Sequence, residues 1–197
     1  MRLQLLALLS LPLLSFASEE QQIPMNNDVN TDYTPLTHSK PTLADLLTIE
    51  PSVSIFYSYA RELELSTIFE DSRIKSTLFV PTNKAVMSLA RKPHQGATAP
   101  SDEGLEISEE EFDSRSRRNV ERWVSAHIVP ESPITLDSEQ HPTLLHRKSI
   151  SFTPISKNDG KGPEWSRVTL EDGVRIIGMK EGLNGVLYLI DGTVSYE

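Results

Sequence analysis

The sequence contains no cysteine, and it is also short of positive charge. Without cysteine, structural disulfides, zinc–thiolate sites, iron–sulfur clusters and thiol catalysis are excluded. The 19 basic residues are outnumbered by 28 acidic residues, which gives a formal net charge of −9. Because such a surface repels a phosphate backbone, nucleic acid is not expected as a partner. The chain has 197 residues, 38% of them hydrophobic, which is typical of one globular domain.

Long apolar runs are absent beyond the first residues of the chain. Residues 1–17 place Arg2 ahead of an apolar run over residues 3–14, and the small residues Ser15 and Ala17 follow. This layout predicts a secretory signal peptide that is cleaved after Ala17. The run is shorter than the roughly 20 residues that span a bilayer. We therefore expect no transmembrane or GPI anchor, and a mature protein that is soluble in a secretory compartment or outside the cell.

Three parts follow from the composition of the chain. Residues 1–17 form the predicted signal, and residues 18–38 form a polar, acidic leader without apolar periodicity, which we expect to be flexible. Residues 39–195 form a single domain. Within it, residues 93–107 are rich in Pro, Gly, Ala, Ser and Asp, and they predict a surface insertion.

Helices are predicted in the first part of the domain and strands in the second. Helix starts are indicated after Thr42, near Ser52, after Thr82 and after Ser108, where capping residues precede apolar positions at helical spacing. The last of these helices carries an apolar stripe that includes Phe112 and Trp123, which we expect to lie in the core. Short strands are predicted at residues 77–80, 126–129, 143–146, 149–153, 165–170, 174–179 and 186–190.

Turn signals separate several of these strands. Asp172 and Gly173 predict a tight hairpin turn, and residues 158–163 predict a looser one. Helices gathered early and strands gathered late predict an α+β domain.

Three motifs in this order are similar to those of a known family. Residues 77–86 read TLFVPTNKAV, residues 124–130 read VSAHIVP, and residues 184–194 read NGVLYLIDGTV. They resemble the signatures of the fasciclin-like (FAS1) domain family, and residues 42–47, TLADLL, resemble its start. The resemblance covers residues 39–195. It implies a twisted β-sheet arranged as a wedge-shaped sandwich and flanked by several short α-helices.

The resemblance also implies a class of function and a location. A single domain with a signal looks like the small FAS1 proteins of fungi, which implies the vacuole lumen, with secretion as the alternative. Lys180 and Glu181 stand where some animal members carry an integrin-recognition dipeptide, so integrin binding is not expected.

The motif residues have physical interpretations of their own. Proline at a strand exit, threonine at a helix cap, asparagine in a turn and Asp-Gly after a strand all serve folding. His127 flanks an apolar strand, and we expect a core histidine whose protonation in an acidic lumen loosens the domain. The residues expected to have such structural roles are Pro81, Thr82, Asn83, His127, Asn184, Gly185, Asp191 and Gly192.

No motif for catalysis or cofactor binding is recognised. The sequence lacks a nucleophile elbow, a Walker loop and a dinucleotide fingerprint. Pro142 lies between His141 and His146 and breaks the helix that paired metal ligands would need, while His38 and His94 fall in the leader and in a loop. Residues 109–111 are explained as an acidic helix start, so we expect no catalytic, cofactor or metal site.

The leading hypothesis is a non-enzymatic FAS1 interaction domain with an unknown protein or glycan partner. A carrier of a lipid or other apolar ligand, held between sheet and helices, is the alternative, and a hydrolase is the third hypothesis. The oligomeric state is not specified by the sequence.

Overall fold

Two parallel strands, β1 (Ser76–Pro81) and β8 (Gly185–Ile190), form the centre of the fold. They belong to a computed structural model that describes residues 40–96, 108–155 and 162–196. The predicted signal peptide, the leader with His38, residues 97–107 of the predicted insertion and most of the predicted turn at residues 158–163 lie outside the described residues.

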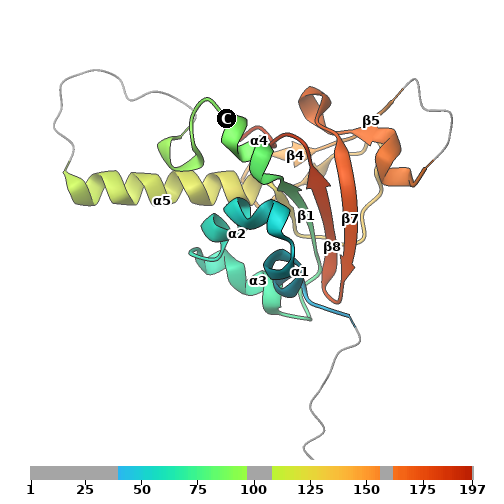
Figure 1. The fold of residues 1–197 in the computed structure, drawn as a ribbon, viewed down its shortest axis with the longest axis horizontal. Coiled ribbons are helices and arrows are strands. Elements are labelled where there is room, and N and C mark those ends of the chain that lie inside the picture. The colour runs from blue at the N-terminus through green and yellow to red at the C-terminus, as the bar shows by residue number, and fades with distance from the viewer. Residues whose placement is uncertain (1–39, 97–107, 156–161, 197) are drawn as a thin grey trace, which may run out of the picture. The chain divides into compact units, whose positions relative to one another are not determined.

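The main sheet has the strand order β2-β1-β8-β7 (Figure 1). β2 (Ile128–Val129) pairs antiparallel with β1, and β7 (Ile176–Gly182) pairs antiparallel with β8. Two smaller sheets each contain two strands: β3 (His141–Pro142) pairs with β4 (Ser149–Ile150), and β5 (Thr153–Pro154) pairs with β6 (Val168–Thr169).

Helices precede and interrupt these strands. They are α1 (Leu43–Ile49), α2 (Ser54–Ala60), α3 (Thr67–Glu70), α4 (Asn83–Ser88) and the longer α5 (Glu109–Ala126). Short 3-10 helices are η1 (Pro51–Val53), η2 (Glu64–Ser66), η3 (Pro93–Gln95), η4 (Glu164–Arg167) and η5 (Glu171–Gly173). The prediction of an α+β domain, with several short helices around a sheet, is confirmed.

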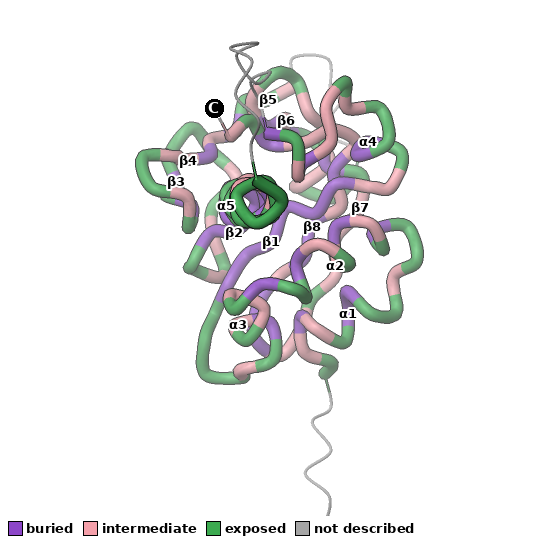
Figure 2. Tube along the Cα trace, turned by 90° about the vertical axis from the view of Figure 1, so that its left-hand side faces the viewer, coloured by how far each residue is buried: buried purple, intermediate pink, exposed green. Residues whose placement is uncertain are grey.

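The core lies on both faces of the main sheet. Successive side chains of a strand point to opposite faces, so Leu78 and Val80 pack in one cluster with the helices, and Phe79 packs in the other. Phe79 stacks on Tyr188 of β8, with ring centroids 5.4 Å apart. β1 is accordingly buried along its whole length and β8 along most of it, as Figure 2 shows.

The predicted helix starts are observed. Thr42 and Asp45 form a reciprocal capping box at α1, Thr82 caps α4, and Ser108 caps α5. The predicted hairpin turn is also observed, because Asp172 has a φ of 56° and Gly173 a φ of 74°.

Two predicted strands are wrong in position. Residues 143–146 are a bend and turn, because Arg147 adopts a φ of 63° and Lys148 donates its N–H back to Leu145, so the strand is β3 instead. The first part of the predicted strand at residues 165–170 is the 3-10 helix η4, which begins after Pro163. The helix α3 was not predicted at all.

Candidate functional site

The first motif joins the central strand to two helices. Pro81 ends β1, and the Thr82 Oγ1 accepts a hydrogen bond of 3.3 Å from the N–H of Ala85. Asn83 ties α4 to α2, since its Oδ1 accepts a hydrogen bond of 2.9 Å from the N–H of Ile55. Its Nδ2 donates to a carbonyl oxygen of η1 at 2.9 Å. The side chain of Asn83 is therefore fully used in joining local elements.

His127 lies completely buried at the end of α5. Its Nδ1 is 2.7 Å from the carbonyl oxygen of Trp123, and its Nε2 accepts a hydrogen bond of 3.0 Å from the N–H of Val194. The pKa of His127 is lowered from 6.5 to about 4, mainly by burial; the hydrogen bond to Trp123 acts in the opposite direction, and the charge of Lys148 contributes to the lowering. The neutral ring thus holds the C-terminal segment against α5.

Asn184 occupies the turn between β7 and β8 and is also fully buried. Its Oδ1 accepts a hydrogen bond of 2.8 Å from the N–H of Leu43, at the start of α1. Its Nδ2 lies within 3.3 Å of three carbonyl oxygens around α3. Next to it, a Cβ on Gly185 would stand 1.8 Å from the carbonyl oxygen of Ser76, so only glycine fits there.

Asp191 and Gly192 fix the end of β8 against β7. The Asp191 Oδ1 accepts the N–H of Arg175 at 2.8 Å, and its Oδ2 accepts the guanidinium at the same distance. A Cβ on Gly192 would approach a methyl carbon of Val174 to 2.6 Å. The first and closing motifs lie side by side, because the N–H of Thr82 donates to the carbonyl oxygen of Ile190 at 3.1 Å, whereas His127 and Asn184 join other elements of the fold.

The described histidines also do not assemble into a metal centre. Within the described residues, no group of three or more His, Cys, Asp or Glu side chains is placed to hold a metal ion. His141 is buried with its Nε2 2.9 Å from the carbonyl oxygen of Thr135, while His146 is exposed.

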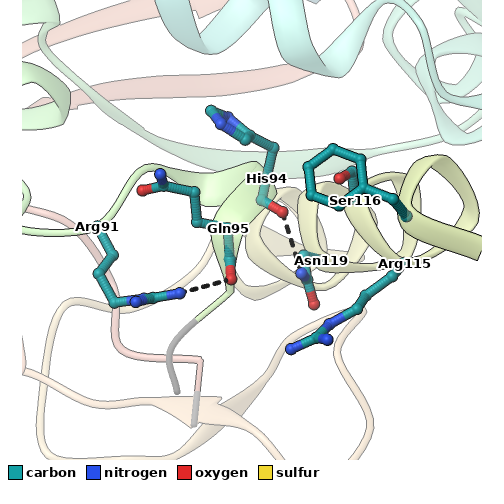
Figure 3. Close-up of a pocket in the computed structure, with 7 residues that line it drawn as sticks. Arg91, His94, Gln95, Arg115, Ser116 and Asn119 are labelled. Carbon is teal, nitrogen blue, oxygen red and sulfur yellow. Dashed lines mark hydrogen bonds between the residues drawn. The ribbon is translucent and has the colours of Figure 1, made fainter. Parts of the chain in front are cut away.

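A pocket of about 350 Å³ opens between η3 and the outer half of α5 (Figure 3). Figure 3 shows the side chains of Arg91 and Arg115 reaching in from the two sides. Among the described residues that line it, no side chain is acidic, although the chain as a whole is acidic. The lining residues are Arg91, His94, Gln95, Phe112, Arg115, Ser116 and Asn119.

The base of this pocket is held by hydrogen bonds from side chains to backbone carbonyl oxygens. The Asn119 Nδ2 donates to the carbonyl oxygen of His94 at 3.1 Å, and the Arg91 Nε donates to that of Gly96 at 3.0 Å. The Tyr59 hydroxyl lies 3.2 Å from the His94 Nδ1 and fixes the imidazole from the side of α2. These contacts position η3 against α5 and give the pocket a defined shape.

The same contacts correct the predicted insertion. Pro93 and Gly96 are buried, and a Cβ on Gly96 would meet the Asn119 side chain at 2.9 Å. Residues 93–96 are therefore part of the packed domain and not of a free surface loop.

Phe112 corrects a second prediction. It was expected in the core, but its side chain is 57% exposed. The buried face of α5 begins only at Val120, because the first turns of the helix extend past the elements that pack on it. Figure 2, which views α5 end on, shows these outer turns exposed. Three residues on, Arg115 lies on the same side of the helix and lines the same pocket.

The sequence did not single out this pocket. Its lining residues come from two segments that are separate in the sequence, residues 91–95 and 112–119. The available signal was Phe112, an aromatic residue inside the polar run of residues 108–119.

Among the described residues, no helix is long and apolar enough to cross a membrane.

Comparisons with known proteins agree with this architecture. The fasciclin domain family model matches residues 51–195. A FAS1 domain-containing protein of Aspergillus fumigatus is 29% identical over 183 residues, which cover 90% of this chain and 73% of that protein. A second, of Emericella nidulans, is 29% identical over 164 residues, which cover 80% of this chain and 63% of that protein.

A solved structure shares the fold. It is a FAS1 domain pair from the insect cell adhesion molecule fasciclin I, with a TM-score of 0.53 and 17% sequence identity. The match covers 79% of this chain and 51% of that one. The chain thus spans only about half of the solved structure and 63% of the second fungal relative.

Proposed function

Because the chain belongs to the fasciclin domain family, we propose that it is a non-enzymatic, adhesion-type interaction domain with a protein or glycan partner. The family is commonly related to adhesion and generally non-enzymatic. For the motif residues Pro81, Thr82, Asn83, His127, Asn184, Gly185, Asp191 and Gly192, we propose structural roles, which their hydrogen bonds and close backbone contacts support.

One observation carries this proposal. The pocket beside α5 combines the exposed aromatic ring of Phe112 with the guanidinium groups of Arg91 and Arg115. Aromatic and arginine side chains are enriched among the residues that dominate binding energy in protein interfaces. The pocket side of η3 and α5, which we call the α5 face, is therefore the proposed contact surface.

The proposed location is the lumen of the vacuole, with secretion as the alternative. It is supported by the pattern of residues 1–17, with a charged start, a short apolar run and small residues before the predicted cleavage after Ala17. A C-terminal fusion to an acid-tolerant fluorescent protein tests it. We expect signal inside the vacuole, signal in the wall or medium would select the alternative, and cytosolic signal would contradict the secretory route.

The interaction itself is tested by cross-linking the wild-type chain in its compartment and identifying the attached molecules by mass spectrometry. We expect a recurrent protein or glycan partner at least tenfold above a bait of equal size and charge. Enrichment no different from that bait would contradict an interaction function.

A further inference from the structure

The charges of α5 are separated along its outer half. Glu109, Glu110, Glu111 and Asp113 form the acidic first turns, and Arg115, Arg117 and Arg118 follow. Residues 108–114 are all exposed, and Figure 1 shows this end of α5 extending beyond α2. An exposed helix that is acidic at one end and basic further on is complementary to a copy of itself in the opposite direction.

Phe112 stands between the two charged stretches. Residues three apart are neighbours on a helix surface, so Glu109 and Arg115 flank Phe112 on its two sides. If two such helices pair antiparallel about Phe112, the residue three positions before it faces the residue three positions after it in the other copy. Each Glu109 then meets an Arg115 of the second copy, and each Phe112 faces the pocket of the second copy.

We propose that the α5 face is a self-association surface, on which two copies of this chain pair through antiparallel α5 helices. In this arrangement Phe112 of each copy enters the pocket of the other, beside the guanidinium groups of Arg91 and Arg115. A phenyl ring next to a guanidinium gains a cation–π contact in addition to apolar burial. The inference rests on the proposed function, because it names a second copy as a partner of the α5 face.

The charge of the pocket indicates which partner it binds, and the size of the contact indicates how tightly. A pocket lined by two arginines favours an acidic partner, and the acidic turns of α5 lie one helical turn away from it. A contact made by a few helical turns is smaller than a standard stable interface. The dimer is accordingly weak and reversible, and it forms at high local concentration.

Sedimentation equilibrium on the purified full chain, up to about 1 mM, tests the pairing. The wild type is expected to show a reversible monomer–dimer equilibrium. Arg115→Glu and Glu109→Arg, measured separately, each place like charges opposite one another, and each should weaken dimerisation at least tenfold. An equimolar mixture of these two variants restores opposite charges at both contacts, and so does the double variant E109R/R115E.

The outcomes decide the proposal. Recovery of the dimer in the mixture and in the double variant supports it, since misfolding of a single variant would not be cured by mixing. A wild type that stays monomeric throughout overturns it. A dimer whose affinity is unchanged in both single variants also overturns it, because another surface would then be responsible. If cross-linking still captures other molecules, only self-association is rejected and the proposed function stands.

Discussion

Replacing Asn184 with alanine is expected to lower the free energy of unfolding by about 4 kcal/mol. The side chain is fully buried and bonds the N–H of Leu43 and three carbonyl oxygens near α3. Alanine would leave these groups unpaired in the core, where each unsatisfied group costs about 1–3 kcal/mol. Denaturant unfolding at pH 7 measures the loss.

Two further variants give the Asn184 prediction its control. Asn119→Ala removes a single hydrogen bond to a partly exposed carbonyl oxygen, and it should cost about 1 kcal/mol. Asn184→Asp keeps the acceptor for Leu43 but places a carboxylate against carbonyl oxygens, so it should be destabilised at pH 7 and partly recover in acid. An Asn184→Ala cost no greater than that of Asn119→Ala would contradict the structural role.

Acid is expected to destabilise the domain through His127. The pKa of this imidazole is about 4 in the folded chain because of burial, whereas an unperturbed histidine titrates near 6.5. Between pH 6.5 and 4, His127 is therefore protonated in the unfolded chain but stays neutral in the folded chain. The free energy of unfolding consequently decreases as the pH falls towards 4. At about 1.4 kcal/mol per pH unit, the loss reaches about 3 kcal/mol.

The hydrogen bonds of His127 explain which part of the fold protonation would destabilise. Protonation would turn the Nε2 of His127 into a donor facing the N–H of Val194, so the C-terminal segment would lose its anchor. We expect His127→Gln to lower stability at pH 7 but to remove most of the slope between pH 6.5 and 4. The free energy of unfolding of the wild type and of His127→Gln is measured at several pH values. Because both proteins contain the same carboxylates, the contribution of the carboxylates cancels in the difference between the two curves.

Exposed His146 provides the matched control for His127. His146→Gln should keep the slope of the wild type, because this change at an exposed position leaves the buried ring of His127 in place. An unchanged slope in His127→Gln would refute the role of the buried ring. If the chain resides in an acidic vacuole, the same slope makes its stability depend on the pH of the lumen.

Local signals made much of the fold predictable. The capping pair of Thr42 and Asp45 and the caps at Thr82 and Ser108 specify helix starts through bonds between near neighbours. In contrast, α3 has four residues, no side-chain cap and a β-branched start, so it carries no local signal. Its carbonyl oxygens are held by Asn184, more than a hundred residues away.

The candidate site was predictable only in part for the same reason. The motif residues stand in recognisable local patterns, but the pocket depends on the packing of η3 against α5, which joins distant segments. The helical periodicity placed Phe112 on the apolar side of α5 correctly. It could not show that the neighbouring elements end before reaching it, which leaves the ring exposed.

The central claim is that the α5 face carries the interaction while the motif residues carry the fold. Its most direct test is cross-linked partner capture by the double variant Phe112→Ser/Arg115→Ser. A matched variant, Ile177→Ser/Arg147→Ser, changes an exposed apolar residue and an exposed arginine outside the pocket.

We expect the α5-face variant to capture at least tenfold less partner than the wild type, whether the partner is another molecule or a second copy of the chain. Its free energy of unfolding should change by less than about 1 kcal/mol. The matched variant should capture as the wild type does. Undiminished capture by Phe112→Ser/Arg115→Ser would contradict the account.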